Sequence, residues 1–489
     1  MIGAGRLHSR YRPEAEADRY VEALNPAHDI DYFILVEPGM GYLIDALRKC
    51  RPGSKAVVLR ADAAFRELES LRPDVPVWYP GDKKTVQEFL EAQIPEGASA
   101  RIVEWRPSLL AYGKACLELV RESAAFIKRA DASSRTSAAF GRRWVRNFFR
   151  NLTILRTALL YERADTPVVV TGSGPGLEAA LPEILAARDG VFVLASSSSL
   201  PALAAGGVIP DMAIGTDGGG WALMHLHACF RLGGAPSPRL ACALSAALPS
   251  RCSELSVLPV CDGSLWQTIA LNAAGVPSAL VPPRGTVTAT ALELALALGA
   301  GWVFLAGMDL SVDGVRSHAR PYEFDNLLFG AASRLRPAYS QAFARSGDIR
   351  AGGSHEVYAA WFRSRLASWS GRVFSLGGRG GVFESAPSLA PFLKAGSPGG
   401  DRRDRFRELS LKGLPGERCR LAGEALIAAL GDPKRAPALA GELAPLLFPS
   451  RCDSPAGSDL AGDLAEELRG IAGRYSGWLA GPDLGEPRG

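Results

Sequence analysis

Residues 166–177 read TPVVVTGSGPGL, so an apolar, β-branched run passes directly into a glycine-rich turn. A helical pattern follows over residues 177–187, and further apolar runs occupy residues 191–195 and 211–215. Short β-branched runs that alternate with helical segments predict a parallel sheet with crossover helices. The chain is therefore expected to contain an α/β domain built around this stretch.

The glycine turn, Gly172–Gly176, lies at the predicted carboxyl end of a strand. Gly172 and Gly174 allow the backbone to turn sharply and approach a bulky anion, and Pro175 suits the first position of a helix. The N–H groups of the next turn, with the helix dipole, favour an anion. The spacing is neither a complete Gly-x-Gly-x-x-Gly fingerprint nor a P-loop. The turn predicts either a phosphate site or an ordinary tight strand-to-helix turn.

Polar residues follow other predicted strands at the same edge of the sheet. The run 191–195 ends in Ser196–Ser199, and the run 211–215 ends at Asp217. Ligands of parallel sheets bind beyond the carboxyl ends of the strands, so these groups predict a site of nucleotide size.

Two later segments add candidates to this site. Gly285-Thr286-Val287-Thr288 leads into a helix, and such residues suit either anion and ribose contacts or plain N-capping. The apolar run 302–306 delivers Asp309 to a strand end, with His318 just beyond. Asp217 and Asp309 are interpreted either as nucleotide or base contacts or as caps of their own strand ends.

Composition limits the class of protein. At 489 residues the chain is long enough for two or three domains, and 47% hydrophobic with 22% charged residues is typical of a soluble globular protein. A net charge of +4 argues against a dedicated nucleic-acid binder. The eight cysteines form no Cys-x-x-Cys pair and are interpreted as reduced thiols, and no metal site is predicted from their spacing to histidines.

The termini and apolar segments predict a cytoplasmic protein. The first residues lack the long apolar core of a signal peptide. The longest apolar region, residues 289–308, divides better into a buried helix and a strand than into a membrane span.

The remaining chain predicts two flanking parts. Strands at 32–36 and 56–60 indicate a small α/β unit, whose own glycine turn at Gly39–Gly41 suits packing or a second nucleotide site. Residues 109–161 form a long helical pattern. The predicted domains are an N-terminal α/β domain (1–110), a helical connector (111–163), a central catalytic domain (164–395) and a helical C-terminal appendage (396–489).

On the connector, arginines recur every four residues at Arg142, Arg146 and Arg150 and so share one helix face. This face is either a solvated basic surface or a basic wall near an anionic substrate.

Several motifs, in order, resemble those of the bacterial motility accessory factors. These motifs are LHSRYRP from Leu7, GMGY from Gly39, GRRW from Gly141 with Asn147 and Asn151, GSGPGL from Gly172, residues 209–217, residues 285–298, and GMDL from Gly307 through His318. The resemblance implies a central Rossmann-like, sialyltransferase-like domain of the 6-hydroxymethylpterin diphosphokinase MptE-like type. It spans roughly residues 5–390.

Three residues depart from the family's motifs. Gly176 replaces a loop serine, Met308 stands where many relatives have Gln, and Arg379 lies about where the family has an acidic residue. Either the donor differs or the activity is reduced.

The resemblance implies a flagellin glycosyltransferase that moves a nonulosonic acid from its CMP-activated form to Ser or Thr, by inverting displacement without a metal or other required cofactor. His318 is then the expected general base or phosphate contact, with Asp309 beside it, although a surface histidine in a loop remains open. The expected nucleotide contacts are Gly172, Ser173, Gly174, Pro175, Gly176, Ser196, Ser197, Asp217, Gly285, Thr286 and Thr288. The alternatives are a non-catalytic flagellin-binding scaffold and a pterin diphosphokinase that uses ATP and Mg²⁺ held by Asp217 and Asp309.

Overall fold

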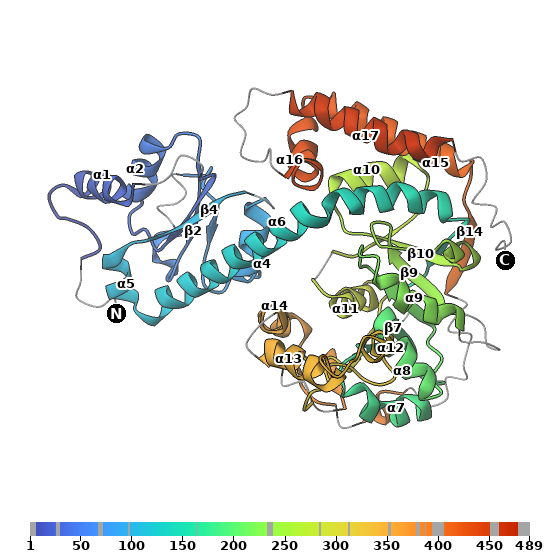
Figure 1. Cartoon of the computed structure of the whole chain (residues 1–489). Coiled ribbons are helices and arrows are strands. Elements are labelled where there is room, and N and C mark those ends of the chain that lie inside the picture. Colours follow the sequence, from blue (N-terminus) through green and yellow to red (C-terminus); the bar gives the residue numbers. More distant parts are fainter. Residues whose placement is uncertain are drawn as a thin grey trace. The chain divides into compact units, whose positions relative to one another are not determined.

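The structure is a computed structural model of the whole chain (Figure 1). It describes residues 6–25, 30–66, 72–95, 98–163, 165–231, 238–282, 285–311, 313–350, 354–377, 382–386, 388–393, 405–449 and 459–477. The chain divides into two compact units, Met1–Ala139 with Phe448–Ser458, and Phe140–Leu447 with Asp459–Gly489. The bounds of the four domains expected from the sequence stay predictions.

The first unit contains a parallel sheet with the strand order β3-β2-β1-β4. Its elements are α1 (Pro13–Leu24), β1 (Tyr32–Val36), α2 (Tyr42–Cys50), β2 (Lys55–Leu59), η1 (Ala63–Phe65), β3 (Val77–Trp78), α4 (Val86–Gln93), β4 (Ala100–Glu104), α5 (Arg106–Tyr112) and the first part of α6 (Lys114–Ile154). Phe33 and Leu35 face one hydrophobic cluster, and Ile34 and Val36 face another. Burial on both faces explains why β1 is a continuous apolar run. The predicted N-terminal α/β unit is confirmed.

The second unit contains a larger parallel sheet, which has eight strands in the described residues, in the order β11-β10-β9-β8-β7-β6-β12-β13. The strands are β6 (Val168–Thr171), β7 (Phe192–Ser196), β8 (Met212–Gly215), β9 (Arg239–Ala243), β10 (Val257–Cys261), β11 (Ala279–Leu280), β12 (Val303–Ala306) and β13 (Val373–Leu376). The predicted α/β fold class, with a central parallel sheet, is confirmed.

Helices and short 3-10 turns connect these strands, and one 3-10 turn, η4, follows β13. They are α7 (Leu177–Ala186), η2 (Ser197–Ser199), α8 (Leu200–Ala205), α9 (Ala222–Arg231), η3 (Ser250–Glu254), α10 (Leu265–Ala273), α11 (Val287–Ala297), α12 (Asp325–Gly330), α13 (Ala338–Arg350), α14 (Ser354–Trp369) and η4 (Ala390–Phe392).

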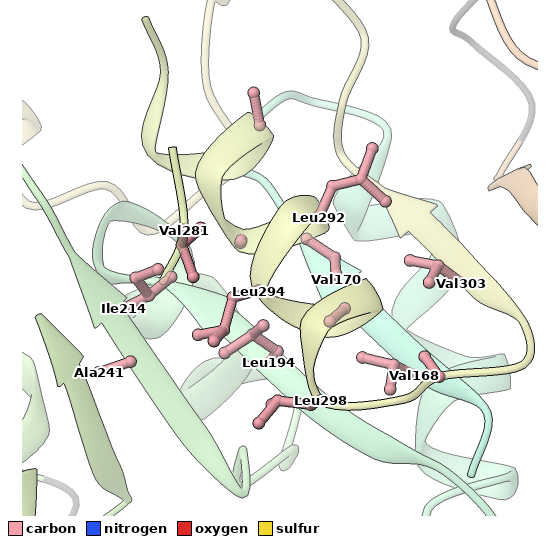
Figure 2. Close-up of a cluster of buried hydrophobic side chains, with 14 of the residues drawn as sticks. Val168, Val170, Leu194, Ile214, Ala241, Val281, Leu292, Leu294, Leu298 and Val303 are labelled. Atoms are coloured by element: carbon pink, nitrogen blue, oxygen red, sulfur yellow. The ribbon is translucent and has the colours of Figure 1, made fainter. Parts of the chain in front are cut away.

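Helix α11 forms the centre of the core of this unit. In Figure 2, Leu292, Leu294 and Leu298 from α11 and its end lie over Val170 of β6 and Leu194 of β7. A helix that is apolar nearly all round is buried rather than amphipathic. This confirms that residues 289–308 divide into a buried helix and a strand. None of the helices in the described ranges combines the length and hydropathy that a membrane span requires.

The prediction that the helical pattern continues to Tyr161 is wrong. Helix α6 ends at Ile154, and β5 (Thr157–Tyr161) pairs antiparallel with β14 (Phe406–Ser410). The partner strand lies about 250 residues away in sequence, so local periodicity could not show it.

The C-terminal segment, predicted to be helical over 396–489, is helical from Pro415 on, whereas its residues Phe406–Ser410 form the strand β14. Helices α15 (Pro415–Leu430), α16 (Ala436–Leu447) and α17 (Leu460–Ser476) pack together, and α15 and α16 contact α10 of the same unit. Glu442 of α16 accepts hydrogen bonds from the N–H groups of Leu265 (2.9 Å) and Trp266 (3.0 Å), at the start of α10. These hydrogen bonds connect the C-terminal helices to α10 of the second unit.

Candidate functional site

The carboxyl ends of β6 and β12 form the topological switch point of the large sheet. Strands β7 to β11 follow β6 on one side, whereas β12 and β13 lie on its other side. Ligands of open α/β sheets bind in the crevice at such a point. The turn Gly172–Gly176 follows β6, and Gly307–Leu310 follows β12, so the structure brings these two sequence motifs together.

The glycines of the first turn allow the two strand-end segments to touch. The N–H groups of Gly172 and Gly174 donate to the carbonyl oxygens of Ala306 and Gly307, both at 2.8 Å. A Cβ atom at Gly172 would lie 2.5 Å from the Gly307 carbonyl oxygen. Neither Gly172 nor Gly174 has a positive φ angle. The close approach of the two segments, rather than an unusual backbone angle, therefore explains why glycine occupies these positions.

Asp309 occupies the N-terminus of α7. Its Oδ2 accepts a hydrogen bond from the Gly176 N–H at 2.6 Å, and the residue is 9% exposed. The Leu177 N–H donates to the Gly174 carbonyl oxygen at 3.0 Å. In this structure the Gly174, Gly176 and Leu177 amides bond acceptors of the protein itself, and their contact with a substrate phosphate stays a prediction. The protein's own carboxylate takes the place that the helix dipole offers to an anion.

The departure at Gly176 has a direct structural consequence. A Cβ atom at this position would lie 2.3 Å from Asp309 Oδ1 and 3.1 Å from its Cγ. The backbone of Gly176 has φ −64° and ψ −16°, which any residue adopts. A Cβ atom at this position is thus disfavoured by the carboxylate of Asp309 as it lies here and not by the backbone conformation.

Ser173 connects three segments of the site, a feature that we call the serine junction. Its carbonyl oxygen accepts the Ala319 N–H at 2.8 Å, and its Oγ accepts from Ser198 Oγ at 3.1 Å. Ser198 Oγ lies 3.3 Å from Ser196 Oγ at the end of β7. The glycine turn, the serine run and the segment carrying His318 therefore meet at one point, as their positions after strands predicted.

The serines of this run differ in accessibility. Ser196, Ser197 and Ser199 are buried, and Ser199 Oγ lies 2.8 Å from Thr171 Oγ1. Ser198 is half-buried and directly contacts Ser173. The run of serines predicted a contact at this strand end but did not distinguish Ser198 from its neighbours.

His318 lies on a segment that is held against the start of α7. Glu178 accepts hydrogen bonds from the Arg316 guanidinium at 3.1 Å and from the Arg320 N–H at 2.8 Å. Ser317 Oγ lies 2.8 Å from His318 Nδ1. The ring of His318 stacks on Tyr322, which the sequence analysis did not single out.

The other predicted contacts show local structural roles. Asp217 Oδ1 accepts the Gly219 N–H at 2.7 Å, and Thr286 Oγ1 caps α11 by accepting the Ala289 N–H at 3.0 Å. Gly285 has φ +73°, which favours glycine. A Cβ atom at Gly172 would lie 3.3 Å from Thr288 Oγ1, so Thr288 does reach the glycine turn.

The end of α6 supports the segments around Asp217. Asn151 donates to the carbonyl oxygens of Leu244 and Ala246, both at 2.7 Å. Asn147 donates to Ser245 O at 3.0 Å, and the Ala247 N–H donates to Asp217 O at 2.9 Å. These asparagines therefore hold the loop on which the Asp217 backbone rests.

The arginines of the same helix do not act alike. Arg142 pairs with Glu467, and Arg150 donates to Leu248 O at 2.8 Å, whereas Arg146 is exposed. Two of the three are thus engaged within the protein, which favours a structural interpretation over a basic wall.

The glycine turn of the first unit is also filled by a side chain. His8 Nε2 accepts the Met40 N–H at 3.0 Å, and a Cβ atom at Gly39 would lie 2.2 Å from the same nitrogen. Trp105 stacks on His8 and donates to Leu7 O at 2.7 Å. Burial lowers the pKa of His8, which suits a neutral imidazole acceptor. These contacts favour the packing role of this turn over a second nucleotide site.

Two further points concern metal ligands and Arg379. Among the described residues, no three His, Cys, Asp or Glu side chains lie together as metal ligands would. Arg379, one of the departures from the family's motifs, lies outside the described residues.

Comparison with known proteins supports this description of the fold. Residues 142–314 match the family described as 6-hydroxymethylpterin diphosphokinase MptE-like. The solved structure of a MAf glycosyltransferase from Magnetospirillum magneticum AMB-1 superposes with a TM-score of 0.51 and 14% identity, over 97% of this chain and 84% of that chain. At this identity the likeness shows the fold.

Two proteins of Treponema pallidum (strain Nichols), both described as uncharacterized, are similar in sequence. One is 28% identical over 307 residues, which are 61% of this chain and 65% of the relative. The other is 33% identical over 94 residues, which are 19% of this chain and 44% of the relative. The matches thus span less than two thirds of either relative. Residues 142–314 thus match an MptE-like domain, and the chain shares the fold of a MAf glycosyltransferase, as its ordered motifs predicted.

Proposed function

We propose that this protein is a glycosyltransferase that moves a nonulosonic acid from a CMP-activated donor to a Ser or Thr hydroxyl of flagellin. The reaction is an inverting displacement that needs no metal ion or other cofactor. The protein acts in the cytoplasm.

The serine junction is the observation that carries the proposal. Hydroxyl groups from two strand ends and the segment of His318 meet beside the switch point of the sheet. Hydroxyl donors suit a phosphate or ribose, and an imidazole suits proton transfer near neutral pH. The fold shared with a MAf glycosyltransferase supports the same assignment.

In the proposed step the acceptor oxygen attacks the anomeric carbon of the sugar. The bond from that carbon to the phosphate oxygen breaks, and CMP leaves with the electron pair. The acceptor proton passes to His318, which acts as general base. The transition state has oxocarbenium character, so the charge that develops on CMP requires hydrogen-bond donors.

The proposal assigns CMP to hydroxyl donors. The amides of Gly174 and Gly176 are engaged by Gly307 and Asp309, so the hydroxyls of Ser173 and Ser198 are the better candidates for the phosphate. Asp309 then acts on the site by fixing the glycine turn and the start of α7.

The test of this function measures both binding and transfer. Calorimetric titration should show CMP binding without Mg²⁺, weakened by Asp217→Ala. His318→Ala should lower sugar transfer to flagellin at least about tenfold while leaving the circular dichroism spectrum unchanged. Unchanged turnover in this variant would remove His318 from the mechanism.

Two other functions are each favoured by one observation. The match of residues 142–314 to an MptE-like diphosphokinase favours pyrophosphate transfer from ATP to a pterin. Mg²⁺-dependent ATP binding in the same titration would support this function. Asp309 in the place of a bound anion favours a scaffold that binds flagellin without modifying it. Silence toward both nucleotides, with flagellin recovered at unchanged mass, would support the scaffold.

A further inference from the structure

Aromatic rings from two separate parts of the second unit form a continuous cluster beside the serine junction. The His318 ring lies parallel to the Tyr322 ring, with centroids 3.9 Å apart and an interplanar angle of 6°. His225, on α9, contacts the same tyrosine at 5.4 Å. His225 also packs on Phe324 at 4.6 Å, and Phe324 meets the edge of Tyr322 at 5.5 Å.

The backbone beside His318 is fixed separately from its ring. The Ala319 N–H donates to Ser173 O, and the Arg320 N–H donates to Glu178 Oε1, both at 2.8 Å. These bonds set the distance of the His318 backbone from the glycine turn but leave its side-chain torsions undetermined. The direction of the imidazole therefore depends on the contacts of the ring itself.

Two ring contacts of His318 are visible. Ser317 Oγ lies 2.8 Å from Nδ1, and the Tyr322 ring covers one face of the imidazole. Ser317 is the adjacent residue in the chain and moves with His318. Tyr322 is 8% exposed and is held by its own neighbours, so it is the firmer of the two constraints.

His225 supports the tyrosine through packing. It is 8% exposed, and its Nδ1 is buried with no hydrogen-bond partner among the described residues. Burial lowers the pKa of His225, against the carboxylates of Glu323 and Asp217, which raise it. A neutral ring whose Nδ1 makes no hydrogen bond acts on Tyr322 by ring contact rather than by charge.

We propose that Tyr322, backed by His225 and Phe324, is a positioning residue that holds the His318 imidazole in the orientation needed for proton transfer. This inference rests on the proposed function, in which His318 is the base. Loss of the tyrosine ring lets the imidazole adopt other rotamers, and a misplacement of about 1 Å lowers turnover by up to about 100-fold.

The kinetic test compares Tyr322→Leu with Tyr322→Phe. The leucine variant should lower kcat by about 10- to 100-fold with little change in the KM for the nucleotide sugar. The phenylalanine variant keeps the stacked ring and should recover most of the activity. Tyr339→Leu is the matched control, because Tyr339 lies on α13, is 67% exposed and is outside this cluster.

A spectroscopic test needs no turnover. With ¹³C-labelled histidine, the ring protons of His318 should show an upfield ring-current shift and cross-peaks to the Tyr322 ring. The six histidines of the chain allow assignment by loss of one signal in His318→Gln. Tyr322→Phe should keep the shift, and Tyr322→Leu should lose it.

The outcomes separate this inference from the proposed function. Wild-type kcat in a folded Tyr322→Leu variant, or a wild-type His318 signal without ring-current shift, overturns the positioning role. If the leucine variant does not fold, the wild-type spectrum and the phenylalanine variant still decide it. Absence of transfer by the wild-type protein overturns the proposed function, while the ring-current measurement still decides whether the rings stack.

Discussion

Replacing Gly176 by alanine should destabilise the second unit through Asp309 alone. The three atoms nearest to an added Cβ all belong to the Asp309 carboxyl group, at 2.3, 3.1 and 3.2 Å. The φ of −64° carries no penalty for alanine, so backbone strain does not contribute. The methyl group must expel the carboxylate from the N-terminus of α7.

The expected cost follows from the interaction that is lost. A hydrogen bond to a charged group contributes about 1.5–3 kcal/mol, and alanine regains about 0.4–1 kcal/mol by restricting the unfolded chain. Gly176→Ala should therefore lower the free energy of unfolding by about 0.5–2.5 kcal/mol. In the Asp309→Ala background the clash is absent, and the same substitution should be neutral or slightly stabilising.

The assay is a double-mutant cycle of Gly176→Ala and Asp309→Ala, in which urea unfolding is followed through the transition of the second unit. Hydrogen exchange of the peptide over residues 172–180 supplies a local measure, because the Gly176 amide should lose protection in either single variant. Gly470→Ala on α17 is the matched control, since a Cβ there meets no atom within 4 Å. Costs that add within about 0.5 kcal/mol across the cycle would refute the coupling of Gly176 to Asp309.

Two further predictions concern the first glycine turn and the C-terminal helices. Because burial lowers the pKa of His8, the unfolded chain binds a proton at this histidine more readily than the folded chain does. The first unit should therefore lose stability as the pH falls below the ordinary histidine pKa of 6.5. In unfolding measured from pH 7.5 to 5, His8→Gln should flatten this dependence. Equal pH slopes in both proteins would contradict this role of His8. Glu442→Ala should destabilise the second unit by about 1.5–3 kcal/mol, because it removes both acceptors at the start of α10. The control is Glu424→Ala, which removes an exposed ion pair with Arg420 and should change the free energy of unfolding by less than about 1 kcal/mol. Similar effects of the two glutamate substitutions would contradict the capping by Glu442.

The sequence predicted strands well where one apolar run made the whole strand. Residues 168–171, 192–196 and 303–306 are buried strands as expected, because parallel strands covered on both faces are continuously apolar. Strands β9 and β10 were not predicted. Strand β10 contains Pro259, which argues against a central strand, yet β10 pairs with both β9 and β11.

The site was predictable in its positions but not in its contacts. Strand-end placement located the glycine turn, the serine run and Asp309 correctly, since the carboxyl ends of parallel strands share one edge. The bond from the Gly176 N–H to Asp309 joins residues 133 positions apart, and Tyr322 stacks on His318 across a turn with no repeating pattern. Such partners depend on tertiary packing, which local propensity and spacing do not encode.

The two glycine turns show why a turn of this kind does not by itself identify a nucleotide site. Each follows the first strand of a parallel sheet at its switch point, and each accepts a side chain of the protein where a ligand would approach. The first turn donates an amide N–H to the neutral imidazole of His8. The second donates an amide N–H to the carboxylate of Asp309 at the N-terminus of α7, where an anion is favoured. The turn at Gly172–Gly176 therefore binds the protein's own carboxylate, Asp309, at the position that a helix N-terminus offers to an anion.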